Sequence, residues 1–491
     1  FPRLAVYNNV EGWQNMQFWG RSEWALEFGD YEVNLTVPAD HIVDATGVLQ
    51  NEKNVLTKEQ RKRWEKARTS FEKPVLIVTQ AEAEKAEKGR SNRTKTWKFK
   101  AKNVRDFAFA SSRKYIWDAM ATNVNGKTVM AVSLYPKEGN PLWEEHSTRA
   151  VATTLIEYSK LTFDYPYPKA ISVHSERQGM EYPMICFNFG RPNPDGSYSD
   201  RTKKGMLGVI IHEIGHNFFP MIVNSDERQW TWMDEGLNSF VEILAELKYD
   251  PELFAMNPAK DITRYMGGDQ SYISPIMSQG DYVKQFGPNA YSKPAAGLYI
   301  LRKTIMGPKL FDYAFRTYAK RWMFKHPTPA DFFRSMEDAS SMDLDWFWRG
   351  WFYTTDVTDI GIKNVKKYHT KTEENEVRFI EDTSKGLSFG QEKDRNSKFH
   401  YEITYNKPGG LVMPIIVYYT YKDGTKERKV YPAQIWRFND NEVTKVFSSS
   451  KEIRKITIDP YQETADVDTS NNSWPKEDKN KFEKFKSNIK G

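Results

Sequence analysis

The chain has 491 residues, of which 28% are charged and 14% aromatic, so its length suggests about three domains and its composition excludes charge-dominated disorder. The single cysteine, Cys186, excludes an intrachain disulfide and any thiolate-rich zinc or iron–sulfur cage. The net charge of +6 is a small difference between 71 basic and 65 acidic residues that are interspersed, so we expect no nucleic-acid partner.

Residues 1–110 are predicted to form a β-rich domain. Tyr31–Val37 and Trp97–Ala101 alternate between polar and apolar residues with a period of two, which is typical of strands. Between them, Asn51–Ser70 has helical spacing with few apolar residues. The charged run Glu82–Arg90 is interpreted as solvated surface.

From residue 111 to residue 358 the pattern becomes helical, which indicates a mainly α domain. The predicted helices are Thr148–Lys160, Gly205–Phe219, Asp234–Leu247, Ala295–Ile305, Asp331–Met336 and Leu344–Phe352.

Residues 359–470 are predicted to form a C-terminal β-sandwich because the period returns to two. The predicted strands are Phe399–Tyr405, Ile415–Tyr421, Lys426–Tyr431 and Ile453–Ile458, with a hairpin turn signal at Asp423-Gly424. Residues 471–491 form a lysine-rich tail. No apolar run approaches the length of a membrane span. The expected fold class is therefore α+β with several domains.

Residues 212–216 read His-Glu-Ile-Gly-His, an H-E-x-x-H sequence. Histidines four apart lie on one face of a helix, so the imidazoles of His212 and His216 can point at one metal ion. Glu213 flanks the same position without ligating and is placed to take a proton from an activated water. The apolar run Met206–Ile211 buries this helix, and two buried histidines without a metal would be poorly satisfied.

The third ligand distinguishes the classes of zinc protein. The extended motif with a third histidine requires His at position 222, where this chain has Ile222. Glu235 follows His216 after eighteen residues and opens the next predicted helix. Two histidines, one glutamate and an open fourth position make a catalytic rather than a structural zinc site. Glu242 is either an acceptor for a histidine N–H or a solvated surface residue, and Asp234 is a second candidate acceptor.

This zinc signature resembles that of the aminopeptidase N family, the gluzincin group that also includes leukotriene hydrolase. Gly179–Pro183 resembles the exopeptidase motif of that family, which lies upstream of the zinc helix as it does here. Tyr291–Lys293 resembles the Tyr-x-Lys segment downstream of the third ligand, and Trp348–Asp356 resembles the end of the catalytic domain. The resemblance covers residues 100–360 and the flanking β segments only in outline.

The resemblance implies a thermolysin-like catalytic domain over residues 111–358 with one Zn²⁺ per chain. His212, His216 and Glu235 would hold the zinc, which polarises the scissile carbonyl and acidifies a water molecule. Glu213 would take the proton of that water and pass it to the leaving amine.

The resemblance also implies how the substrate is held. Tyr291 would donate its hydroxyl to the tetrahedral oxyanion. Glu181 would bind the free α-amino group, so the substrates would be peptides with a free N-terminus. Gly179 and Met180 would line the edge along which the extended substrate lies.

The sequence departs from the family at several positions. Asp234 stands where the family usually has Asn, and Tyr182 and Gln178 replace residues that are common in its exopeptidase motif. Pro294 follows Lys293 and is compatible with a helix only in the first turn.

The chain is also expected to be a shorter form of the family. Residues 1–110 would make up about half of the family's saddle-shaped N-terminal domain, and the long C-terminal helical domain would be absent. Because the sequence opens at Phe1, we interpret it as a mature or trimmed chain. The expected location is the periplasm or the cell surface, and the sequence carries no signal for the oligomeric state.

Two other functions stay open at this point. A gluzincin endopeptidase would share the zinc site but would not depend on Glu181. A non-catalytic, peptidase-like binding scaffold belongs to a different class, and such modules typically lose a ligand or the base, whereas this chain has all of these residues. Cys186 is interpreted as a buried structural thiol rather than a nucleophile.

Overall fold

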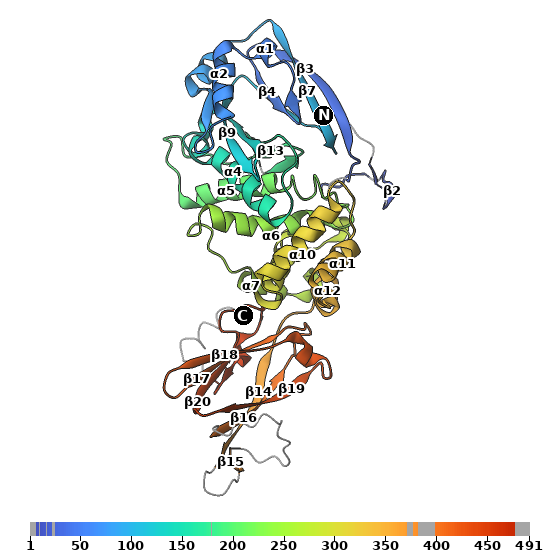
Figure 1. Cartoon of the computed structure of the whole chain (residues 1–491), viewed down its shortest axis with the longest axis vertical. Coiled ribbons are helices and arrows are strands. Elements are labelled where there is room, and N and C mark those ends of the chain that lie inside the picture. The colour runs from blue at the N-terminus through green and yellow to red at the C-terminus, as the bar shows by residue number, and fades with distance from the viewer. Residues whose placement is uncertain are drawn as a thin grey trace. The chain divides into compact units, whose positions relative to one another are not determined.

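A computed structural model describes residues 6–8, 10–15, 17–21, 25–177, 179–370, 377–381 and 398–476 (Figure 1). The chain divides into two compact units, which are described separately. The first unit runs to residue 256 and includes 276–298 and 308–342. The second unit contains 257–275, 299–307 and the chain from residue 343 onward.

The first unit begins with small β-sheets, as predicted. A three-stranded sheet has the order β3-β7-β5, and two pairs, β1-β2 and β4-β8, accompany it. The strands are β1 (Tyr7–Asn8), β2 (Gly12–Trp13), β3 (Gly29–Pro38), β4 (Ile42–Ala45), β5 (Val48–Leu49), β7 (Thr94–Val104) and β8 (Phe109–Ser112). The helices are α1 (Glu52–Val55), α2 (Lys58–Ala67) and α3 (Gln80–Glu87). Thr57 and Thr79 begin α2 and α3 with capping boxes.

A six-stranded mixed sheet follows, with the order β12-β13-β11-β10-β9-β6. Its strands are β6 (Val75–Val78), β9 (Ile116–Val124), β10 (Lys127–Tyr135), β11 (Lys169–His174), β12 (Met180–Tyr182) and β13 (Ile185–Asn188). The prediction of a helical pattern from residue 111 is therefore wrong for most of 111–188. Every residue of β11 and most of β9 and β10 are buried, so these strands show no alternation with a period of two.

Helices cover this sheet (Figure 1). Two of the helices of this unit carry the residues of the predicted zinc motif. The long helices of the first unit are α4 (Leu142–Leu161), α5 (Asp200–Gly215), α6 (Thr231–Tyr249), α10 (Pro308–Trp322) and α11 (Pro329–Ser340). A π-helical segment, Gly287–Ser292, continues into α9 (Lys293–Ile300). The predicted helices are confirmed, with two differences at their carboxyl-terminal ends. Helix α5 ends four residues before the predicted end at Phe219, and α9 ends at Ile300, where a π-helical segment, Leu301–Ile305, continues to the predicted end.

Asp118, on β9, is buried beneath α4 and has a perturbed pKa. Its carboxylate accepts hydrogen bonds from Tyr135 Oη, at 2.5 Å, and from Thr148 Oγ1. Burial raises the pKa of Asp118 to about 7. Because the folded state holds this proton more tightly than the unfolded state, the contribution of Asp118 to stability falls as the pH rises from about 4 to about 7.

The stability of the Asp118→Asn variant relative to wild type is therefore expected to increase as the pH rises. The difference in unfolding free energy should shift toward the variant by up to about 4 kcal/mol between pH 4 and pH 7. Urea denaturation of both proteins at the two pH values measures this shift. A difference that does not change with pH would mean that Asp118 does not titrate in this window.

The second unit contains two four-stranded sheets, which confirms the predicted C-terminal β-sandwich. One sheet has the order β15-β14-β16-β19 and consists of Val377–Glu381, Gly361–Thr370, Phe399–Asn406 and Glu442–Ser449. The other has the order β18-β17-β20-β21 and consists of Lys426–Tyr431, Ile415–Tyr421, Ile453–Ile458 and Ser473–Trp474. Tyr419 of β17 stacks on Phe447 of β19, with the ring centroids 3.9 Å apart. Aromatic stacking therefore joins the two sheets of this unit.

Short helices complete the second unit: α7 (Pro258–Asp261), α8 (Thr263–Met266) and α12 (Asp345–Tyr353). The α+β, multidomain fold class is confirmed. The predicted domain limits at residues 110, 358 and 470 stay predictions, and residues 477–491 of the lysine-rich tail lie outside the described residues. Within the described part of the chain, no helix is both long and apolar enough to cross a membrane.

Candidate metal centre

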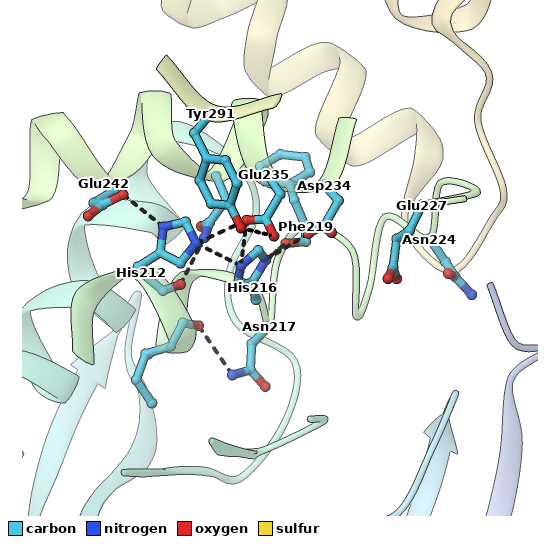
Figure 2. A network of polar contacts seen from close by, with 12 residues as sticks. His212, His216, Asn217, Phe219, Asn224, Glu227, Asp234, Glu235, Glu242 and Tyr291 are labelled. Carbon is cyan, nitrogen blue, oxygen red and sulfur yellow. Dashed lines mark hydrogen bonds and ion pairs between the residues drawn. The ribbon is translucent and has the colours of Figure 1, made fainter. Parts of the chain in front are cut away.

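Three side chains converge at the ends of α5 and α6 with the spacing of metal ligands (Figure 2). His212 Nε2 lies 3.0 Å from His216 Nε2 and 3.1 Å from Glu235 Oε2, and His216 Nε2 lies 3.3 Å from Glu235 Oε2. Tetrahedral zinc with bonds of about 2.0–2.1 Å separates its ligand atoms by about 3.3 Å. The residues present therefore fit a zinc ion.

The two helices are held together by hydrogen bonds that do not involve the ligand atoms. Asn238, on α6, donates from Nδ2 to the carbonyl oxygen of His212 at 2.8 Å. Its Oδ1 accepts a hydrogen bond from Tyr158 of α4, also at 2.8 Å. Asn238 and Tyr158 are completely buried. This contact fixes the carboxyl-terminal end of α5 against the first turns of α6.

A carboxylate faces the outer nitrogen of each histidine (Figure 2). Glu242 Oε2 lies 2.8 Å from His212 Nδ1, so the structure places Glu242 as an acceptor rather than as solvated surface. Asp234 Oδ1 lies 3.0 Å from His216 Nδ1, which also lies 2.8 Å from the carbonyl oxygen of Phe219. Such contacts orient the imidazole rings and make their inner nitrogens better metal ligands.

Glu235 is ionised and therefore suited to bind a cation. Burial raises its pKa, but His216 and the hydrogen bond with His212 outweigh burial, so the pKa of Glu235 lies well below its usual value.

Glu213 follows His212 on α5 and points into the same site. Its side chain is 7% exposed, and its Oε2 atom has no hydrogen-bond partner among the described residues. Burial and the nearby Glu181 raise the pKa of Glu213 to about 8. The backbone of Gly179 lies directly against this carboxylate, because a Cβ at position 179 would overlap Oε1. A buried carboxyl group with one unpaired oxygen is suited to accept and return a proton.

Tyr291 lies over the metal ligands from the π-helical segment. Its hydroxyl donates to Glu235 Oε1 at 2.5 Å, and its ring stacks on His212 with the centroids 5.7 Å apart. Burial and Glu235 raise the pKa of Tyr291, so the hydroxyl keeps its proton. Pro294 is the second residue of α9, but α9 continues directly from the π-helical segment, so Pro294 lies within a longer helical stretch and not in the first turn where the sequence predicted it. It packs on Gly236, where a Cβ would lie only 2.5 Å from Pro294 Cγ.

Glu181 approaches from β12, at the edge of the six-stranded sheet. Its side chain is 6% exposed, and one carboxylate oxygen lies within 4.8 Å of ligand atoms of Glu213 and His216. Met180 precedes it on β12, and Cys186 is its partner on β13. Burial raises the pKa of the Cys186 thiol, and the expectation of a buried thiol is confirmed. The structure thus brings all ten predicted site residues into one region.

Sequence reasoning missed three polar residues that support this region: Asn238, Arg105 and Glu227. Glu227 lies in the buried segment 224–228 between the two zinc helices, and Arg105 lies in the loop after β7. The polar run Asn-Ser-Asp-Glu-Arg at 224–228 was a signal, since so many polar residues between two buried helices require partners. No local pattern marks Arg105.

Comparisons with known proteins agree on one family. Residues 147–351 match the model of the peptidase family M1 domain. Glutamyl aminopeptidase from Bos taurus is 25% identical over 224 residues, which is 44% of this chain and 22% of that protein. Alanine/arginine aminopeptidase from Saccharomyces cerevisiae is 24% identical over 231 residues, which is 43% of this chain and 26% of that protein.

The fold is also similar to that of a solved structure. The crystal structure of Legionella pneumophila aminopeptidase A in complex with aspartic acid has a TM-score of 0.59 at 12% identity. The alignment covers 93% of this chain and 46% of that one. The chain therefore spans less than half the length of each of these three relatives.

Proposed function

Given that this chain belongs to peptidase family M1, the zinc metallo-aminopeptidases, we propose that it hydrolyses the N-terminal residue from peptides. One observation carries the proposal: the buried carboxylate of Glu181 lies within 4.8 Å of His216 and Glu213, beside the three ligand atoms. A fixed anion so close to the metal centre can hold a free α-ammonium group only while the first peptide bond lies at the metal.

His212, His216 and Glu235 would hold one zinc ion per chain, which when bound polarises the scissile carbonyl and acidifies a water molecule. Glu213 accepts the proton of the attacking water at its unpaired Oε2 atom and later delivers it to the leaving amine.

Tyr291 stabilises the negative charge that develops on the carbonyl oxygen. Its hydroxyl donates to Glu235 Oε1 in the structure and keeps its proton, so it remains a donor. For the oxyanion to be bound, this hydrogen bond has to pass from Glu235 to the substrate. One such donor is typically worth about 3–4 kcal/mol in the barrier.

Glu181→Ala separates an aminopeptidase from an endopeptidase. The variant is expected to lose at least about tenfold in kcat/KM for aminoacyl-arylamides, because a buried charge-assisted contact with the α-ammonium is lost. Cleavage of an N-blocked peptide should change far less, since that substrate has no ammonium group. Steady-state kinetics on both substrates, with wild type and variant side by side, measures the difference. Equal losses on the two substrates would contradict the exopeptidase function.

A further inference from the structure

Three buried carboxylates meet beside the metal centre. Glu181, Glu227 and Asp234 each place one oxygen within 4.8 Å of the others, and their side chains are 6%, 0% and 1% exposed. They come from β12, from the segment between the zinc helices, and from α6, respectively. Asp234 faces His216. Glu227 pairs with a buried arginine, Arg105.

Arg105 is the buried cation of this group. Its Nη1 atom lies 2.5 Å from Glu227 Oε1 and donates to Asn224 Oδ1 at 2.9 Å. Arg105 is only 4% exposed. Burial lowers the pKa of Arg105, but Glu227 and Glu181 outweigh burial and raise it. The guanidinium therefore stays charged and lies within electrostatic range of both glutamates.

Glu181 has no such partner. Among the residues that the structure describes, no hydrogen bond or ion pair is made by its carboxylate, although the side chain is more than nine-tenths buried. It is also the most exposed of the three carboxylates. A buried carboxylate without a partner is costly, and an incoming cation would relieve that cost.

We propose that Glu227 is a positioning residue that keeps Arg105 away from Glu181, and so leaves the Glu181 carboxylate for the α-ammonium group of the substrate. This inference rests on the proposed function. The competition is direct, because a guanidinium and an ammonium group would both pair with the same carboxylate. Glu227 and the side-chain amide of Asn224 hold the guanidinium of Arg105, and among the described residues no hydrogen bond or ion pair joins Arg105 to Glu181.

Each substitution at Glu227 and Arg105 has an expected direction of effect on recognition of the ammonium group. Glu227→Gln removes the anion that holds Arg105, which then pairs with Glu181 and competes with the substrate. Arg105→Gln in the same chain removes the competitor, so the double variant should recover. Arg105→Gln alone leaves Glu181 without a competitor and should retain recognition of the ammonium group.

The test uses the zinc-loaded chain and two inhibitors that differ only in the amine. Leucine hydroxamate and its desamino analogue, 4-methylpentanoyl hydroxamate, both chelate zinc, so the ratio of their inhibition constants reports the ammonium contact alone. Glu227→Gln should reduce the preference for the amine at least about tenfold, and the double variant should restore it to within about threefold of wild type. Asp44→Asn, which breaks the buried Asp44–Lys169 pair elsewhere in the first unit, is the matched control and should leave the ratio unchanged.

The outcomes are distinct. A wild-type chain that binds both hydroxamates equally, or does not hydrolyse aminoacyl-arylamides, overturns the proposed function. A wild-type preference that survives Glu227→Gln, or a double variant no better than Glu227→Gln, overturns the role of Glu227. If Glu227→Gln does not fold, Arg105→Gln alone decides: a retained preference for the amine supports the proposal, and a lost one overturns it.

Discussion

Glu213→Gln is expected to lower kcat for aminoacyl-arylamide hydrolysis by about 10² to 10⁴-fold while zinc stays bound. The substitution keeps the shape of the side chain against Gly179 but removes the group that accepts the proton. The three ligand atoms are unchanged, because Glu213 is not one of them. Steady-state kinetics together with the zinc content of the purified variant measures both halves of this expectation.

Glu246→Gln is the matched control for this experiment. Glu246 is also 7% exposed, and burial and Glu242 raise its pKa to about 8, as burial and Glu181 do for Glu213. It lies on α6 and contributes no ligand atom. The activity of the Glu246→Gln variant should stay within about tenfold of wild type, because the loss of a general base typically costs at least about a hundredfold. A zinc-loaded Glu213→Gln protein with more than a tenth of wild-type activity would rule out Glu213 as the base.

His212→Ala is expected to abolish zinc binding and activity together. His212 Nε2 contacts both other ligand atoms, so its loss leaves a two-residue site that cannot complete the ligand set of a catalytic zinc centre. The zinc dissociation constant should rise by more than about a hundredfold. This exceeds the effect of losing a residue that only orients a ligand, which is at most about a hundredfold. Metal titration of the metal-free proteins measures this constant, and 1,10-phenanthroline should inactivate the wild-type chain in the same assay.

Glu242→Gln provides the graded comparison for the metal site. It keeps every ligand but replaces the carboxylate 2.8 Å from His212 Nδ1, so a rise of about 10- to 100-fold in the dissociation constant is expected. If His212→Ala retained zinc as well as Glu242→Gln, or if wild-type turnover persisted after chelation, His212 would not be a ligand. Thermal unfolding of each variant verifies that the fold is intact.

The zinc helices could be predicted because their signals are local. The spacing of His212 and His216 requires a helix for both rings to meet, and the apolar run before them requires that the helix be buried. The C-terminal strands alternate because only one face of each sheet meets the sandwich core. The central sheet could not be predicted in the same way. Strand β11 is buried on both faces, so its sequence has no period for either a strand or a helix.

The residues of the site also differ in whether a local sequence signal marks them. His212, Glu213, His216 and Glu235 lie within a single stretch of sequence, whereas Glu181 and Tyr291 were located only through a family resemblance. The role of Glu242 stayed open in the sequence because a glutamate two turns along a helix is equally compatible with solvent. Arg105 could not be found, since its position beside Glu227 is created by packing between segments 122 residues apart, and no spacing rule connects them.

The hydrogen bonds between Asn238, Tyr158 and the backbone of His212 have a further consequence for folding and zinc binding. The polypeptide itself sets the distance between the histidine-bearing helix and the glutamate-bearing helix, through side chains that never touch the ion. In small zinc domains the metal supplies the energy of folding, and chelators denature them. Because the contacts that join these two helices do not involve the ligand atoms, we expect this chain to keep its fold when zinc is removed and to bind zinc again without refolding.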